Sequence, residues 1–257
     1  MYYYTGLLVK DWKISMKGQW QTFLLLLLLW LLGLGASIHW KSPDIVLGIS
    51  LTLIGIHIFY ISVDMLLNFG AEMKLKIWLH NPASSSAMLT SKLTISLLNC
   101  LLSIFYCVCF YAFSCILFGE SFLQGKSLYD ALALIWTIIG IAVYLGIWTL
   151  FFWSLFTALK SNRLAYWRYV ICGIFAYILL RLHLHFFSSE WFSILQSLGT
   201  FQAFGISTSV IQQDMYYQEV AMGVQISNFS IALFILFSVL SIVVFFFTAK
   251  NITKIEI

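Results

Sequence analysis

Long uninterrupted runs of apolar residues alternate with short polar segments along this chain of 257 residues. Six runs are long enough to cross a membrane, and they lie at about 19–38, 45–67, 93–118, 131–158, 169–187 and 228–248. An α-helix rises about 1.5 Å per residue, so about 20 residues span the hydrocarbon core. The run 23–34 lacks the period-two alternation of a β-barrel strand. The pattern therefore predicts an all-α integral membrane protein with six transmembrane helices in a single domain, 1–257.

Lysine and arginine are unevenly divided between the two sides that these helices would define. Of the 14 basic residues, Lys41 and Lys126 fall on one side and Arg181 falls within a helix. The other side carries Lys10, Lys13, Lys17, Lys74, Lys76, Lys92, Lys160, Arg163, Arg168, Lys250 and Lys254. By the positive-inside rule the basic side is the cytoplasm. Both termini are therefore predicted to be cytoplasmic.

The first 18 residues have the pattern of an amphipathic helix. At about 100° per residue, Leu8, Trp12 and Met16 fall within one arc, and three lysines gather opposite. Asp11 lies at the edge of the apolar arc and weakens the pattern. A helix of this kind lies on the cytoplasmic leaflet with its lysines facing anionic lipid. We therefore expect an interfacial helix at 1–18 that contacts membrane lipid.

The cytoplasmic segment 68–92 is the most patterned of the connections. Its first part continues an apolar helical face made of Leu66, Phe69, Met73 and Ile77. The sequence His80-Asn81-Pro82 then ends that helix, because proline lacks an N–H donor and disfavours helical geometry in the preceding residue. One of the serines 84–86 is expected to cap a new helix that runs through Met88 into the third transmembrane helix. Such a helical hairpin suits docking to a soluble partner.

The segment 188–227, between the fifth and sixth transmembrane helices, differs from the other connections. It contains no lysine or arginine and many aromatic residues and glutamines. Its part 191–202 is too apolar to extend freely into water. We therefore expect short helices that lie on the outer surface or dip back between the transmembrane helices as an outer gate.

Composition excludes several classes of protein. With 61% hydrophobic and 9% charged residues, the chain cannot cover a soluble surface. The basic residues form thin belts rather than a dense patch, which argues against nucleic-acid binding. The five cysteines all fall within the predicted helices and lack the spacing of metal ligands. They are predicted to be buried thiols, with no metal site and no disulfide framework.

The stretch of this chain that is most similar to a catalytic motif differs from it in spacing. Residues 119–127 resemble a phosphate-binding P-loop, but five residues separate the glycines where the motif has four, and no strand precedes them. The chain has no H-E-x-x-H, paired-glutamate or G-x-S-x-G motif. We therefore expect no catalytic residue and no cofactor in this chain, which is predicted not to be an enzyme.

Ionisable groups within the helices are candidates for function, because burying a charge in lipid costs about 2.5–3.5 kcal/mol on insertion scales. His57 and Asp64 are seven residues apart and share a helical face with Asn68. One interpretation is a polar stripe that lines a cavity or relays protons. The other is interhelical hydrogen bonding by a neutral His57, with Asp64 paired to a lysine near the cytoplasmic interface.

A second candidate group lies in the fifth transmembrane helix. Arg181 follows Arg168 by about 20 Å of helix, which places it in the outer part of the bilayer. His185 is on the same face. These residues form either a cationic feature at the outer mouth or an anchor, in which Arg181 extends outward to pair with Glu190 or another acid.

In layout the chain resembles the ABC-2 type transporter permeases, the transmembrane subunits of bacterial ABC exporters. The resemblance lies in the six helices, the cytoplasmic ends, the amphipathic first segment, the cytoplasmic helical hairpin and the long aromatic segment before the last helix. The stretch Lys76-Ile77-Trp78-Leu79-His80-Asn81-Pro82, with Lys92 beyond it, resembles the coupling region of small Bacillota-type permeases. The closing residues 251–257 resemble their short charged tails.

The resemblance implies a division of labour in a bacterial cell membrane. Two permease copies, identical or different, would dimerise, and each would rest on a cytoplasmic ATPase subunit that holds ATP and Mg. Residues 69–89 would enter a groove on that ATPase, and the expected coupling residues are Met73, Lys76, Ile77, Trp78, Leu79, His80, Pro82 and Met88. The second and fifth transmembrane helices would line the path and the dimer seam. The exported substrate would be hydrophobic or amphipathic, with a peptide favoured.

Two other classes of protein stay open at this point. An ion-coupled secondary transporter or channel would use His57 and Asp64, and it would usually show more intramembrane carboxylates and inverted repeats. A membrane scaffold that transports nothing would use the segment 68–92 only as a docking surface.

Overall fold

The structure is a computed structural model that describes residues 2–75, 84–120, 128–160, 165–214 and 217–253. In this part of the chain, six helical segments are long and apolar enough to cross a membrane. They are Tyr4–Trp40, Pro43–Gly70, Ser85–Phe118, Ala131–Leu159, Arg168–Phe187 and Ile231–Ile252. Each contains most or all of one predicted apolar run. The prediction of a helical multi-pass membrane protein is therefore confirmed.

Twelve elements make up the described part of the chain. In order they are α1 (Tyr2–Trp40), α2 (Pro43–Gly55), the 3₁₀ turn η1 (Ile56–Phe59), α3 (Tyr60–Leu75), α4 (Ser85–Phe118), α5 (Leu128–Lys160), the 3₁₀ turn η3 (Ala165–Trp167), α6 (Arg168–Phe187), α7 (Glu190–Ser197), β1 (Thr200–Asp214), β2 (Tyr217–Ser230) and α8 (Ile231–Thr253).

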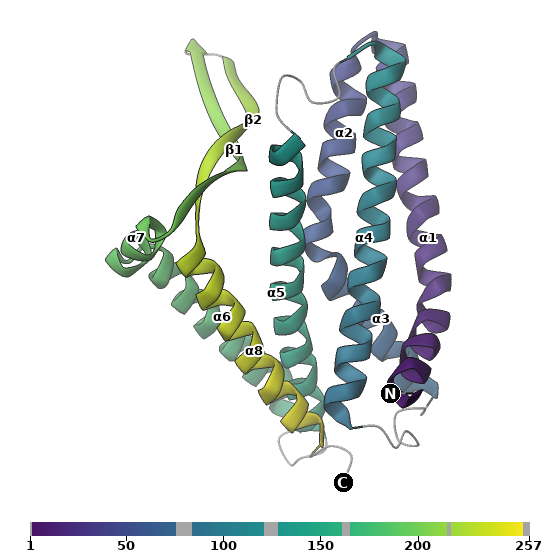
Figure 1. Ribbon diagram of the computed structural model, residues 1–257, viewed down its shortest axis with the longest axis vertical. Helices are drawn as coiled ribbons and strands as arrows, with labels where there is room; N and C mark the ends of the chain where they lie inside the picture. Colours follow the sequence, from purple (N-terminus) through teal and green to yellow (C-terminus); the bar gives the residue numbers. More distant parts are fainter. Residues whose placement is uncertain (1, 76–83, 121–127, 161–164, 215–216, 254–257) are drawn as a thin grey trace.

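The helices form one closely packed group and a more open edge (Figure 1). Helices α1, α4 and the α2–α3 segment pack together, and α5 packs against α3 and η1. Helices α6 and α8 lean away from this group, although α8 keeps contact with α5. Four helix ends lie at the same end of the molecule, namely the start of α1, the end of α3, the start of α4 and the end of α8 (Figure 1). We call this the basic end, because Lys10, Lys92 and Lys250 lie there.

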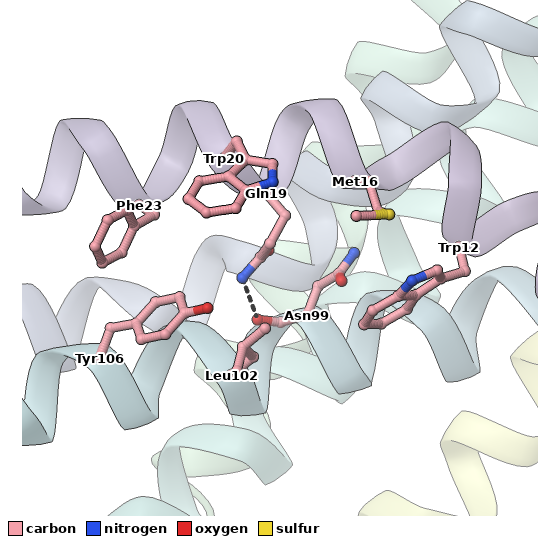
Figure 2. A pocket seen from close by; sticks show the side chains of 8 residues that line it. All are labelled: Trp12, Met16, Gln19, Trp20, Phe23, Asn99, Leu102 and Tyr106. Atoms are coloured by element: carbon pink, nitrogen blue, oxygen red, sulfur yellow. Dashed lines mark hydrogen bonds between the residues drawn. The ribbon is translucent and has the colours of Figure 1, made fainter.

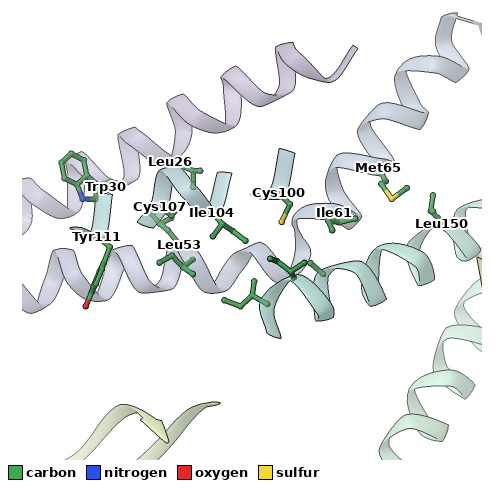
Figure 3. Packing of buried hydrophobic residues seen from close by; sticks show 14 of the residues in the cluster. Leu26, Trp30, Leu53, Ile61, Met65, Cys100, Ile104, Cys107, Tyr111 and Leu150 are labelled. Carbon is green, nitrogen blue, oxygen red and sulfur yellow. The ribbon is translucent and has the colours of Figure 1, made fainter. Parts of the chain in front are cut away.

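Buried apolar side chains form one main core within the closely packed group. Figure 3 shows Leu26 and Trp30 of α1 facing Cys107 and Tyr111 of α4. Trp30 also donates a hydrogen bond from Nε1 to Ser114 Oγ at 3.0 Å. Small residues allow the helices to approach closely, as membrane helices require. Cysteines 100, 107 and 115 are buried in or beside this core, as predicted, and no disulfide joins the five cysteines. The prediction of buried thiols is wrong for Cys109, which is exposed, and Cys172 is only half-buried.

The second transmembrane segment is interrupted, which the sequence analysis did not predict. It was expected to be one continuous helix, but η1 separates α2 from α3. In this turn the His57 ring places Nδ1 2.6 Å from the carbonyl oxygen of Leu53, four residues earlier. A side chain that competes for a helical carbonyl disturbs the regular ladder of backbone hydrogen bonds. A short 3₁₀ stretch inside a helix often marks a hinge.

The N-terminal residues form the first turns of α1, and no break in the helix marks the boundary predicted at residue 18. Helix α1 runs without a break for 39 residues, about 58 Å. Leu7, Asp11 and Ser15 are buried at helical spacing, because this face of α1 continues along α4. The three predicted lipid-facing residues stay on the outside, since Trp12 and Met16 are exposed and Leu8 is half-buried.

Helix α4 begins and ends at the residues that its sequence favours. Ser84 is the N-cap, and its Oγ accepts a hydrogen bond from the Ala87 amide at 3.3 Å, as the predicted serine cap requires. Gly119 ends the helix with φ +71°, and the Glu120 amide donates to the Cys115 carbonyl at 2.9 Å. This is a left-handed glycine C-cap. The first glycine of the P-loop-like stretch therefore has a structural role.

The segment after α6 contains a β-hairpin where short helices were predicted. Helix α7 is capped by Ser189 and agrees with the prediction. Beyond it, β1 and β2 pair antiparallel from Thr200↔Ser230 to Asp214↔Tyr217, with an irregularity between Gln212 and Asp214. Phenylalanine, isoleucine, valine and threonine are frequent here, and such residues favour strands. The all-α expectation thus holds for the transmembrane helices and is wrong for this hairpin, which lies beside α5 (Figure 1).

Candidate functional site

Polar side chains gather along the inner contacts of α1, the η1–α3 segment and α4. We call this set the polar seam, and its members are Asp11, Ser15, Gln19, His57, Tyr60, Asp64, Asn68, Ser91, Lys92, Ser96, Asn99 and Ser103. Helix α4 contributes five of them. They share its buried face because their spacing follows the helical repeat.

An ion pair lies at the basic end of the polar seam. Lys92 Nζ lies 3.2 Å from Asp11 Oδ1, and the two side chains are 2% and 5% exposed. Ser91 Oγ donates to the other carboxylate oxygen at 2.5 Å, and the Lys92 ammonium lies 5.2 Å from the centre of the Phe69 ring. One charged pair therefore joins α1 to α4 and touches α3. A buried pair is tolerated where hydrogen bonds complete the coordination of both charges.

Asp64 is hydrogen-bonded to uncharged side chains. Its Oδ2 accepts from Ser96 Oγ at 2.5 Å and from Asn68 Nδ2 at 3.1 Å. Because Ser96 belongs to α4, this carboxylate joins α3 to α4. The expected lysine partner is thus replaced by a serine and an asparagine. Lys92, the nearest lysine along the seam, pairs with Asp11 instead.

Amide side chains connect α1 to both of its neighbours. The Tyr60 hydroxyl donates to Gln19 Oε1 at 2.6 Å, which joins α3 to α1. The Asn99 amide donates to Ser15 Oγ at 3.0 Å, which joins α4 to α1. Asn99 is 1% exposed, and burying such a group is costly unless it is hydrogen-bonded.

His57 is enclosed, and both of its ring nitrogens have partners. Nδ1 lies 2.6 Å from the Leu53 carbonyl oxygen, and Nε2 lies 2.8 Å from Ser103 Oγ on α4. The ring also stacks on Tyr60 at 5.5 Å between centres. The side chain is 2% exposed. This geometry matches the interpretation of His57 as an interhelical hydrogen-bonding residue, and the polar stripe predicted from its spacing faces α4.

Arg181 and His185 lie on α6, at the open edge of the molecule and away from the polar seam. Arg181 is exposed, and its Nε donates to the Tyr177 hydroxyl at 3.0 Å within the same helix. His185 is also exposed. Their neighbour His183, which the sequence analysis did not select, hydrogen-bonds the Tyr144 hydroxyl of α5. That contact joins α6 to α5.

Most of the expected coupling residues lie outside the described residues. This applies to Lys76, Ile77, Trp78, Leu79, His80 and Pro82. Met73 lies in the last turns of α3. Met88 is 2% exposed and packs against Leu7 of α1, so it points into the protein rather than toward a partner.

The side chains of the polar seam are arranged for hydrogen bonding between helices rather than for catalysis. Within the described ranges, no group of three or more histidine, cysteine, aspartate or glutamate side chains is placed to hold a metal ion. The sequence indicated His57, Asp64 and Asn68 but not their partners. The misfit of Asp11 in the amphipathic pattern was the one sequence feature that pointed to the other members of the polar seam.

Comparison with models of protein families, with curated proteins and with solved structures finds no match for this chain. The resemblance to ABC-2 type permeases therefore remains a hypothesis that rests on layout.

Proposed function

We propose that this chain is the permease subunit of an ATP-driven ABC exporter in a bacterial cell membrane. The observation that carries the proposal is the arrangement at the basic end. Both ends of the described chain lie there (Figure 1). The two helices that flank the 76–83 connection, α3 and α4, also have their adjoining ends there. A cytoplasmic ATPase subunit, with its ATP and Mg, would contact this end.

The lengths of the helices support an ATPase contact beyond the membrane surface. The segment from Pro43 to Leu75 is helical throughout, and 33 residues correspond to about 50 Å. The hydrocarbon core is about 30 Å thick, so this segment exceeds it by about 20 Å. Helix α4 is similarly long, with 34 residues. In the proposed assembly the two helices would extend past the lipid on the cytoplasmic side and would present the connection between them to the ATPase.

The polar seam supplies a way to transmit movement from that connection. The Asp11–Lys92 pair and the Asp64–Ser96 hydrogen bond join α1, α3 and α4 near the basic end. In the proposed mechanism, ATPase closure displaces the 76–83 connection, and these contacts make the three helices move together. The turn η1 lies further along the same segment and is the place where it would bend.

Exposed apolar faces support the proposed dimer seam and path. No residue of α6 is buried. The second transmembrane segment also has an exposed stripe at helical spacing, made of Ile56, Phe59, Val63 and Leu67. In the proposed assembly, a second permease copy, identical or different, covers part of these faces. A path lined by such side chains suits a hydrophobic or amphipathic substrate, and we propose a peptide.

The same geometry disfavours ion coupling through His57 and Asp64. An ion-coupling group must exchange its ion with water, whereas both nitrogens of His57 are engaged and its side chain is 2% exposed. Asp64 accepts two hydrogen bonds from neutral donors. A structural role for both residues requires no further assumption.

Purification from native membranes tests the proposal. The tagged chain is extracted in mild detergent, its partners are identified by mass spectrometry, and ATP hydrolysis is measured with and without vanadate. We expect a stoichiometric P-loop ATPase and vanadate-sensitive turnover. A homo-oligomer that carries no ATPase, obtained in several mild detergents, would contradict the proposal.

A further inference from the structure

A groove opens on the outer side of the contact between α1 and α4. Its volume is about 140 Å³, and it is lined by Trp12, Met16, Gln19, Trp20, Phe23, Asn99, Leu102 and Tyr106. Figure 2 shows the aromatic side chains of both helices along its length, with the Gln19 and Asn99 side chains between them. Trp20 is 61% exposed, so the groove is open toward the surroundings of the protein.

The groove crosses the level at which the hydrocarbon core ends. We place the outer edge of the hydrocarbon core at Gly119, where α4 ends and the charged Glu120 follows. Measured along α4 from this point, Tyr106 is about 20 Å away and Asn99 is about 30 Å away. The hydrocarbon core is about 30 Å thick. Tyr106 and the neighbouring Phe23 therefore lie among the acyl chains, whereas Asn99 lies near the boundary on the basic side. Trp12 lies beyond this boundary, at the depth of the lipid headgroups.

Polar groups line the groove at two depths, with Gln19 at the level of the ester region of a phospholipid and the Tyr106 hydroxyl deeper, among the acyl chains. Gln19 Nε2 donates to the Asn99 carbonyl oxygen at 3.5 Å, which is a long and weak hydrogen bond (Figure 2). The Tyr106 hydroxyl has no hydrogen-bond partner among the residues that the structure describes. Both groups have hydrogen-bonding capacity for an acceptor such as an ester carbonyl.

Positive charge flanks the groove only at its headgroup end. At about 100° per residue, the groove-lining residues of α1 centre on the direction of Met16 and Phe23. Lys13 follows Trp20 at the edge of this arc, about 70° from its centre, and Lys17 lies about 40° further round the helix. Both lysines are exposed. They are close in sequence to Trp12 and Met16, so their charge lies at the level of the headgroups. Such lysines attract anionic lipid with about 1 kcal/mol each.

We propose that this groove binds one anionic phospholipid from the basic-side leaflet. Its acyl chain packs along Trp20, Phe23 and Tyr106, its ester region meets Gln19, and its phosphate lies near Lys13, with Lys17 further round the helix. The bound lipid covers the outer side of the α1–α4 contact, next to the polar seam. The proposal stands on the groove itself and does not depend on the ATPase partner.

Native mass spectrometry of the purified full chain tests the proposal, with dioleoyl-phosphatidylglycerol and dioleoyl-phosphatidylcholine as probes. We expect one phosphatidylglycerol to bind at least about ten-fold more tightly than phosphatidylcholine, because two lysines contribute. Leu102→Trp fills the groove and should abolish this preference. Its matched control is Leu101→Trp, because Leu101 is exposed on the same helix and does not line the groove.

A charge variant provides a second test that does not alter the packing. Lys13→Gln should weaken phosphatidylglycerol binding about five-fold and leave phosphatidylcholine binding unchanged. Lys250→Gln removes a charge at the same end of the molecule, on α8, and should change neither. Size-exclusion profiles establish that each variant folds. Equal binding of the two lipids, or equal effects of the two tryptophan variants, would overturn the proposal and indicate nonspecific lipid around the protein.

Discussion

Lys92 and Asp11 form an ion pair that is almost inaccessible to solvent, with 3.2 Å between Nζ and Oδ1. The two residues are 81 positions apart, and they hold the first turns of α1 against the first turns of α4. Because the 76–83 connection precedes α4, this pair lies close to the proposed coupling element. The contribution of this ion pair to the stability of the protein can therefore be measured by removing its charges.

Breaking this pair from one side should destabilise the protein. Lys92→Met leaves the Asp11 carboxylate buried without its main counter-ion, and we expect a loss of about 3 kcal/mol in the free energy of unfolding. Titration of the protein with SDS in dodecyl maltoside micelles measures this quantity. Lys10→Met is the matched control, because Lys10 approaches the same carboxylate at 3.4 Å but is 29% exposed. It should cost less than about 1 kcal/mol.

The double variant Asp11→Leu with Lys92→Met completes this test. Removing both charges leaves no uncompensated group, so most of the lost stability should return. A double variant as unstable as Lys92→Met alone would show that the pair is not the source of the effect.

Asp64→Asn separates a hydrogen-bonding role from an ion-coupling role. The asparagine oxygen accepts the same hydrogen bonds from Ser96 and Asn68, so ATP hydrolysis by the purified complex should stay within about two-fold of the wild type. Removing a group that transfers protons costs about 100-fold or more. Asp64→Leu serves as the opposite control, because it cannot accept either hydrogen bond and should impair assembly. A large loss for Asp64→Asn in an intact complex would support the ion-coupled alternative.

The contact between α3 and α5 depends on a glycine. A Cβ added at Gly146 would lie 2.6 Å from Ile61 Cγ2 and 3.4 Å from Ile61 Cβ. Gly146→Ala should therefore cost about 1–3 kcal/mol in the same unfolding titration. Gly140, on the same helix, has no atom within 4 Å of an added Cβ. Gly140→Ala should leave stability unchanged or raise it by up to about 1 kcal/mol. Equal effects at both positions would contradict the packing described here.

Arg181→Gln should have little effect on ATP hydrolysis by the complex. The side chain is exposed on α6, and its described hydrogen bond is to Tyr177 of the same helix. We expect a change smaller than that caused by any charged substitution between residues 76 and 82. A larger loss from Arg181→Gln, with the complex still assembled, would assign this residue a role in transport.

Local sequence patterns predicted the elements that depend on local physics. The six transmembrane helices follow from apolar runs, and the start of α4 follows from the serine cap at Ser84. The β-hairpin was missed because a mixture of aromatic residues and glutamines fits surface helices as well as strands. Pairing between Thr200 and Ser230 is a contact over 30 residues, and no periodicity within one strand reveals it.

The polar seam was likewise predictable only where it depends on spacing within one helix, and not where it depends on contacts between helices. The common face of His57, Asp64 and Asn68 was predictable from their spacing. Their partners Ser96 and Ser103 were not, because serine is frequent throughout α4 and only the packing of α4 selects which hydroxyl meets which residue. Asp11 departed from the amphipathic pattern for a physical reason, since it faces α4 rather than water or lipid.

The central claim is that the 76–83 connection couples this chain to an ATPase, and Trp78→Glu tests it most directly. The tagged wild type and the variant are purified in parallel from native membranes, and the amount of co-purified ATPase and its vanadate-sensitive turnover are measured. Tyr166→Glu, in η3 at 94% exposure, is the control for a charge added elsewhere at the basic end. The account predicts that Trp78→Glu is inserted normally but loses the ATPase, whereas Tyr166→Glu retains it. Normal recovery of an active ATPase with Trp78→Glu would contradict the account.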